Sequence, residues 1–216
     1  MNGEFLARME DVLHLYSLPY NAQHPVVCFD ERPCVLHGEV VEPLQMRPGK
    51  PHRQDYEYER KGTCCLLVAV EPLTGFRMVE VSKQRTARDY TRFMQKIAKH
   101  YKAAGQIRLV QDNLNTHTAA SFYKHLPAAE AFALAQHFDV HYTPKKGSWL
   151  NMAELEISAM VRQCLGRRIE SRERMTDEVG QLVNERNEQK ARVHWQFTPE
   201  AARQKLKRHY QKVLHK

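Results

Sequence analysis

The sequence has no apolar run long enough to cross a bilayer. Its longest, CCLLVAV at residues 64–70, falls far short of the roughly 20 residues that a membrane-spanning helix needs. The N-terminal stretch MNGEFLARMEDV carries acids where a signal peptide would have an apolar segment. Repeats and low-complexity tracts are also absent. These absences predict a soluble protein, and we expect it in the cytoplasm with no membrane partner.

Cysteine is scarce and poorly spaced for a zinc site or a disulfide framework. The count is odd, no pair has C-x-x-C spacing, and three of the residues lie in apolar, strand-like runs. We therefore expect reduced core side chains, as is typical of a cytosolic protein. The cysteines are Cys28, Cys34, Cys64, Cys65 and Cys164.

Acidic residues are outnumbered. The 216 residues contain 33 Lys and Arg against 25 Asp and Glu, which gives a formal net charge of +8. A surplus of this sign predicts a polyanionic partner, with nucleic acid ahead of a membrane surface, because basic side chains neutralise phosphates and release counterions. The length suits one well-cored domain.

The hydrophobic pattern predicts an α/β protein with a mixed sheet and helices on both faces. A strand at 25–30 ends on Asp30, and a strand at 107–112 ends on Asp112. Strands at 62–70 and 75–82 flank the turn EPLTG and form a hairpin, and a further strand covers 138–144. Residues 43–61 are either a long loop or an irregular hairpin arm. Helices are expected at 3–16, 86–101, 118–137 in two pieces, 148–165 with Ser148 as N-cap, 173–190, and from Pro199 with Thr198 as cap.

Two predicted strands end on a carboxylate, and packing alone does not explain this. If the strands are neighbours, Asp30 and Asp112 lie side by side, and two carboxylates about 4 Å apart repel by roughly 4 kcal/mol at an effective dielectric constant of about 20. A divalent cation would relieve this repulsion, and an all-oxygen site selects Mg²⁺ or Mn²⁺. Either Glu154 or Glu156 could join the cluster but not both, because residues two apart face opposite sides of a helix. In the alternative interpretation, the two aspartates form turns and Glu154 is a solvated helix residue.

Basic residues interleaved with aromatic ones suggest contacts to a nucleic acid backbone with stacking on bases. In the segment 43–61, the basic residues are accompanied by His52, Tyr56 and Tyr58. The alternative interpretation is that this segment is a solvated loop. Two lysines before the 148–165 helix could bind phosphate near its N-terminus. The candidate DNA-binding residues are Arg47, Lys50, Arg53, Arg60, Lys61, Lys145 and Lys146.

Three polar residues near the acids are candidates to support the metal ligands. His117 could contact the scissile phosphate or orient a metal-bound water, or it could cap a helix start. Asn113 is expected to fix the turn after Asp112. Asn151 is three residues from Glu154 and shares its helix face. Glu31 is expected to point away from Asp30 and to have a structural role.

The segments VVCFDE, LVQDNLNTH and HYTPKKGSWLNMAELE, in this order, resemble the catalytic domain of bacterial insertion-sequence transposases of the DDE type, in the mariner superfamily. The resemblance covers nearly the whole chain. It implies an RNase H-like fold in which Asp30, Asp112 and Glu154 bind two Mg²⁺ or Mn²⁺ ions, and its N-x-x-E pattern favours Glu154 over Glu156. We expect a helix and linker at 1–24, the catalytic domain at 25–190 with 43–61 inserted, and a basic C-terminal helix within 191–216.

The resemblance implies a Mg²⁺-dependent endonuclease and strand transferase. Such an enzyme cuts terminal inverted repeats, joins them to TA target sites, and acts as a homodimer on DNA of the bacterial nucleoid. Full-length relatives carry helix-turn-helix modules ahead of this domain, whereas here the chain begins just before the first predicted catalytic strand. A separately encoded helix-turn-helix protein is therefore one expected partner. Two alternatives remain open: a truncated, catalytically silent DNA-binding or dimerisation fragment, and an RNA–DNA hybrid nuclease.

Overall fold

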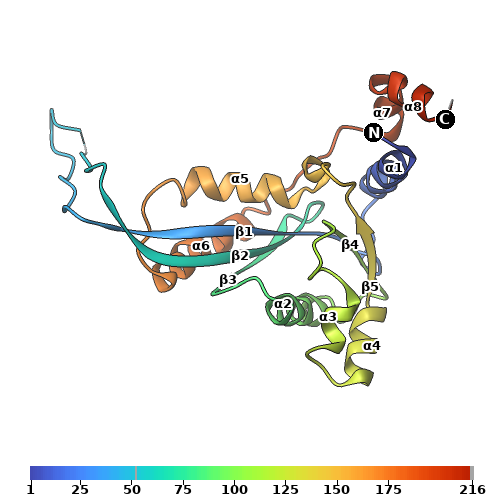
Figure 1. Cartoon of the computed structure of the whole chain (residues 1–216), viewed down its shortest axis with the longest axis horizontal. Coiled ribbons are helices and arrows are strands. Elements are labelled where there is room, and N and C mark those ends of the chain that lie inside the picture. Colours follow the sequence, from blue (N-terminus) through green and yellow to red (C-terminus); the bar gives the residue numbers. More distant parts are fainter. Residues whose placement is uncertain (52, 215–216) are drawn as a thin grey trace.

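A five-stranded mixed sheet lies at the centre of the computed structural model, which describes residues 1–51 and 53–214 (Figure 1). The strand order is β3-β2-β1-β4-β5, and β1 pairs antiparallel with β2 and parallel with β4. β2 and β3 are antiparallel, and β4 and β5 are parallel. The predicted mixed α/β sheet is therefore confirmed. The strands are β1 (Val26–Glu39), β2 (Tyr58–Glu71), β3 (Phe76–Ser82), β4 (Ile107–Gln111) and β5 (Phe138–Tyr142).

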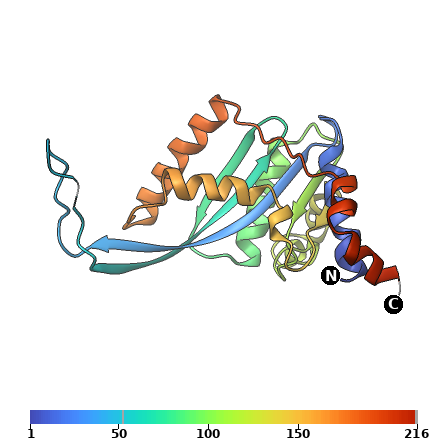
Figure 2. The same ribbon diagram turned by 90° about the horizontal axis from the view of Figure 1, so that it is seen from above.

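Helices cover both faces of this sheet (Figure 2). One face packs against α2, α3 and α4, and the other against α1, α5, α6 and α7. None of the helices in the described residues is both long enough and apolar enough to span a membrane. The helices are α1 (Gly3–Ser17), α2 (Ala87–His100), α3 (Ala119–Tyr123), α4 (Ala128–Gln136), the 3-10 turn η1 (Ser148–Leu150), α5 (Ala153–Gln163), α6 (Arg172–Glu188), α7 (Pro199–Lys205) and α8 (Lys207–Leu214).

Strand β2 is apolar on both sides because both of its faces are covered. Leu66 and Val68 pack on the side of α5 and α6, whereas Cys65 and Leu67 pack on the side of α2. A strand buried on both faces has a continuous apolar run rather than an alternating one, which explains the segment CCLLVAV. All five cysteines are free, and only Cys34 is not fully buried.

Strands β1 and β2 continue past the helices and form a projecting hairpin arm, defined here as residues 36–62 (Figures 1 and 2). The ladder shifts register between Leu36 and His37, where the arm begins. Toward the tip, two isolated bridges join Leu44 to Arg53 and residues 47 to 50. Of the two interpretations of 43–61, the irregular hairpin arm is therefore correct, with β2 already starting at Tyr58.

One arginine between α5 and α6 braces the base of this arm. Arg168 donates through Nη1 to Glu39 Oε2 (2.6 Å) and to the carbonyl oxygen of Glu57 (2.7 Å). Its Nη2 donates to the carbonyl oxygen of Asp55 (2.7 Å). The guanidinium thus satisfies polar groups that the irregular arm leaves without ladder partners.

Two predicted boundaries near the acids are wrong. Strand β1 does not end at Asp30 but continues to Glu39. The antiparallel ladder with β2 pairs Asp30 with Val68 and then also pairs the residues that follow Asp30. Ser148 does not cap a continuous helix. It opens η1, and the chain leaves helical geometry at Asn151, whose Oδ1 accepts the N–H of Ala153 (3.1 Å), before α5 begins.

The C-terminal segment returns to the first helix. Thr198 caps α7 as predicted, with its Oγ1 accepting the Ala201 N–H (3.2 Å) and Pro199 following as the first helical residue. Within residues 191–214, two short helices, α7 and α8, follow an extended segment. Arg203 Nη2 donates to Glu10 Oε2 of α1 (2.6 Å), so both ends of the described chain lie side by side (Figure 1).

Candidate active site

Asp30 and Asp112 come from adjacent parallel strands at the centre of the sheet. The last parallel pair between β1 and β4 is Cys28 and Val110, and each acid lies two residues beyond its own strand's member of that pair. Adjacent parallel strands therefore deliver both carboxyl groups to the same level of the sheet. The prediction that these two strands are neighbours is confirmed.

Helix α5 adds Glu154 in its first turn. Asn151, just before the helix, donates through Nδ2 to the carbonyl oxygen of Phe29 (2.7 Å) and to Asp30 Oδ2 (3.2 Å). Asn151 is itself buried. These hydrogen bonds tie the start of α5 to β1 beside the aspartate.

Asp30 is electrostatically strained by this arrangement. Burial is the largest cause that raises its pKa to about 7, and the negative charges of Glu154 and Asp112 add to it. A hydrogen bond from the backbone N–H of Glu31 to Asp30 Oδ1 (2.7 Å) opposes the rise without cancelling it. A positive ion beside Asp30 would offset the cost of burying a charged carboxylate and would relieve its repulsion by the neighbouring acids.

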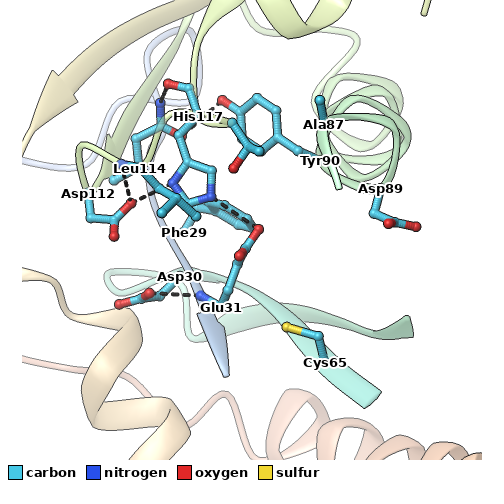
Figure 3. A network of polar contacts seen from close by, with 12 residues as sticks. Phe29, Asp30, Glu31, Cys65, Ala87, Asp89, Tyr90, Asp112, Leu114 and His117 are labelled. Carbon is cyan, nitrogen blue, oxygen red and sulfur yellow. Dashed lines mark hydrogen bonds and ion pairs between the residues drawn. The ribbon is translucent and has the colours of Figure 1, made fainter. Parts of the chain in front are cut away.

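Asp112 is held by its own turn and by a histidine (Figure 3). Its Oδ1 accepts the N–H of Leu114 (3.1 Å) and lies 2.5 Å from Nδ1 of His117. Burial raises the pKa of Asp112, but the hydrogen bond and charge of His117 outweigh it and hold that pKa below its ordinary value. Burial likewise lowers the pKa of His117, but Asp112 and Glu31 outweigh it and raise that pKa to about 9.

His117 does not cap a helix start, which was one of the two alternatives for it. Its ring bridges two carboxylates, and α3 instead begins after Thr118, which makes no side-chain cap. Asn113 fixes the turn, as expected, because its Nδ2 donates to the carbonyl oxygen of Thr143 (2.6 Å) beyond β5. Arg8 of α1 donates to Asn113 Oδ1.

Glu156 points away from the aspartates. Its side chain is 1% exposed, and its two carboxylate oxygens accept Nε (2.8 Å) and Nη2 (2.9 Å) of Arg186 from α6. Nε of Arg77 in β3 lies 3.1 Å from Glu156 Oε1. Glu156 is thus enclosed by two arginines, whereas the negative charge of Glu154 acts on Asp30.

The acids suit hard cations without forming a closed cage. Within residues 1–51 and 53–214, no three His, Cys, Asp or Glu side chains converge as a ready-made metal site. Mg²⁺ is commonly bound through one or two carboxylates, with waters and substrate phosphates completing its shell. Carboxylates paired with Asp30 fit that requirement, because the donors are all oxygen and the negative charges of Glu154 and Asp112 both act on Asp30.

The seven candidate DNA-binding residues fall into two separated groups. The hairpin arm carries five of them, all exposed, and the turn between β5 and η1 carries the other two, also exposed. The arm extends away from the end of the sheet where β5 lies, so the two groups are not brought together (Figure 1). His52 lies outside the described residues. The arm group is Arg47, Lys50, Arg53, Arg60 and Lys61, and the turn group is Lys145 and Lys146.

The strand order and the helices on both faces define an RNase H-like fold. Residues 25–176 match the family model described as DDE superfamily endonuclease. The chain belongs to this family.

Solved structures of a transposase share the fold. The Mos1 mariner paired-end complex with Mn has a TM-score of 0.56 at 16% identity, the Mos1 transposase paired-end complex with left transposon end 0.58 at 15%, and the Mos1 strand transfer complex 0.54 at 15%. The matches cover 87–88% of this chain but 59% of each solved chain. The search of curated proteins found no match.

Proposed function

We propose that this chain is the catalytic domain of a transposase, which cleaves DNA at the terminal inverted repeats of a mobile element and joins the freed ends to target DNA. The observation that carries the proposal is the position of Asp30, on a strand next to the one that leads to Asp112 and under the negative charges of both Asp112 and Glu154, in a member of the DDE endonuclease family. The similar Mos1 structures include a complex with a transposon end and a strand transfer complex, which supports DNA as substrate.

Asp30, Asp112 and Glu154 are the proposed catalytic residues and metal ligands. Asp30 and Asp112 would hold one divalent ion, and Asp30 and Glu154 a second. When bound, Mg²⁺ or Mn²⁺ lowers the pKa of the attacking water or hydroxyl and neutralises charge on the phosphate. Asn151 fixes the orientation of Asp30 through its 3.2 Å hydrogen bond.

DNA would be held mainly by basic side chains. The exposed arm residues Arg47, Lys50, Arg53, Arg60 and Lys61 suit contacts to backbone phosphates, and Lys145 and Lys146 would add contacts near the start of α5. We assign residues 25–190 to the catalytic unit, with 1–24 and 191–216 as flanking segments. Action as a homodimer, and recognition of the ends by a helix-turn-helix module, belong to the same proposal.

A plasmid-nicking assay tests the catalytic assignment. Purified protein is mixed with supercoiled plasmid and Mn²⁺ or Mg²⁺, and nicked circles are quantified for wild type and for Asp112→Asn and Glu154→Gln. We expect nicking by wild type, none by either variant, and wild-type nicking by Asp139→Asn, a matched carboxylate change on β5. Joining is followed with a labelled duplex that carries a free 3′-hydroxyl.

The assay also separates the alternatives. Salt-sensitive DNA binding without nicking at any metal concentration would favour a silent DNA-binding fragment. Preferential cleavage of an RNA–DNA hybrid over duplex DNA would favour a hybrid nuclease. Nicking that survives Asp112→Asn would refute the proposed ligand set.

A further inference from the structure

A second carboxylate lies behind Asp112, linked to it through one histidine. Glu31 follows Asp30 in β1, so its side chain points to the opposite face of the sheet. There, Glu31 Oε1 lies 3.1 Å from Nε2 of His117, whose Nδ1 lies 2.5 Å from Asp112 Oδ1 (Figure 3). The two faces of the strand therefore act on the same site, Asp30 directly and Glu31 through the imidazole.

Glu31 is costly to bury. Its side chain is 4% exposed and that of His117 1% exposed, and Glu31 Oε2 is buried without a hydrogen-bond partner among the described residues. Both ring nitrogens of His117 lie within hydrogen-bond distance of a carboxyl oxygen, Nε2 of Glu31 and Nδ1 of Asp112.

The histidine ring cannot rotate away from this position. It stacks on Tyr90 with ring centroids 5.0 Å apart and meets the edge of Phe29 at 5.1 Å. Its backbone carbonyl oxygen accepts hydrogen bonds from Gln111 Nε2 (3.0 Å) and from the Tyr142 hydroxyl (2.9 Å). Ring and backbone are both fixed.

Asp112, by contrast, has a side chain that is 44% exposed, and apart from His117 its carboxylate is held by the N–H of Leu114 in its own turn. We propose that Glu31 is a positioning residue, which acts through His117 to hold the Asp112 carboxylate in the orientation that binds the catalytic cation. This deepens the proposed function and rests on Asp112 being a metal ligand. Groups that orient ligating side chains typically contribute 10–100-fold to metal affinity.

Direct metal binding tests the proposal without relying on catalysis. Mn²⁺ is titrated into the DNA-free chain, free Mn²⁺ is measured by electron paramagnetic resonance, and thermal unfolding is followed in parallel. For Glu31→Gln, which preserves side-chain size, we expect Mn²⁺ affinity to fall by about tenfold or more. The Mn²⁺ concentration for half-maximal nicking should rise similarly, with the rate largely recovered at saturating metal. A lowered unfolding temperature with unchanged Mn²⁺ affinity would overturn the proposal.

A double-mutant cycle asks whether Glu31 acts through the histidine. His117→Asn breaks the link from the other side and provides a second measurement if Glu31→Gln does not fold. In the His117→Asn background, adding Glu31→Gln should change Mn²⁺ affinity little further. Additive losses would mean that Glu31 acts by another route and would refute the proposal.

The surface of the chain offers a matched control. His141 also lies between two carboxylates, at 2.8 Å from Asp11 Oδ2 and 3.2 Å from Asp139 Oδ2, but away from the acids of the site. Asp139→Asn should leave Mn²⁺ affinity unchanged. If Asp112→Asn abolishes nicking while Glu31→Gln leaves metal affinity intact, the positioning role fails and the proposed function stands. If Asp112→Asn nicks normally, the proposed function fails.

Discussion

Glu154 and Glu156 lie two residues apart in α5, and the same substitution should affect them in opposite ways. Glu154→Gln removes a negative charge that repels Asp30. Glu156→Gln removes the negative charge that lies between Arg77 and Arg186. We expect the first to abolish nicking with stability kept or slightly raised, and the second to destabilise the fold.

The size of the second effect follows from burial. Arg77 has a fully buried side chain, Glu156 is 1% exposed, and Arg186 is 18% exposed. Breaking a buried ion pair by removing one partner costs about 3–5 kcal/mol, because the remaining charge is left uncompensated. The free energy of unfolding of a typical domain is roughly 5–15 kcal/mol, so Glu156→Gln would remove a large fraction of it.

Urea denaturation followed by circular dichroism measures both variants. With a denaturant slope near 3 kcal/mol/M, the Glu156→Gln midpoint should fall by roughly 1–2 M, whereas the Glu154→Gln midpoint should not fall. Nicking by folded Glu156→Gln protein should persist at low temperature. The reverse pattern, with a stable but inactive Glu156→Gln and an active Glu154→Gln, would show that the roles of the two glutamates are exchanged.

Three further outcomes are expected. Asn151→Ala should lower the free energy of unfolding, measured by urea denaturation, by about 1–3 kcal/mol, because the buried carbonyl of Phe29 loses its hydrogen-bond donor. Nicking should also weaken, and an unchanged free energy of unfolding would contradict this prediction. The rate at which iodoacetamide alkylates Cys34 should have its pH midpoint near 7, because a hydrogen bond from Cys64 stabilises the Cys34 thiolate and lowers its pKa. The rate should fall below that pH, and Cys64→Ala should move the midpoint upward. Equal rates for all cysteines would disprove this. Replacing Arg47 and Lys50 by Gln should reduce the slope of log affinity against log salt by about 2, and an unaltered slope would argue against phosphate contacts there.

Much of the fold could be predicted from local patterns. The apolar runs of β2 and β4 and the capped starts of α2 and α7 are encoded within a few residues, so they were placed within a residue or a few. The length of β1 could not be predicted in this way, because charged residues and Pro33 interrupt the apolar pattern of residues 31–39, and their pairing partners lie in β2. The break before α5 likewise depends on a bond from Asn151 to a distant strand.

In the candidate site, too, some residues could be predicted from local sequence patterns, whereas the roles of others depend on residues far away in the chain. Asp30 and Asp112 could be proposed because each follows an apolar run, and helix periodicity separates Glu154 from Glu156. The arginines that enclose Glu156 carry no sequence pattern, because Arg77 lies in β3 and Arg186 in α6. For Glu31, the sequence indicated only the direction of its side chain, because alternation along a strand puts it on the face opposite Asp30. What it touches there depends on His117, 86 residues away.

Strand β1 is continuous from Asp30 into the hairpin arm, with one register shift between Leu36 and His37. A strand rises about 3.3 Å per residue, so removing two residues from each side of the arm beyond that shift would shorten its reach by about 7 Å. Every remaining side chain would keep its face, whereas removing one from each side would invert them all. The reach of the proposed DNA-binding arm can therefore be changed in steps of two residues without moving Asp30, Asp112 or Glu154.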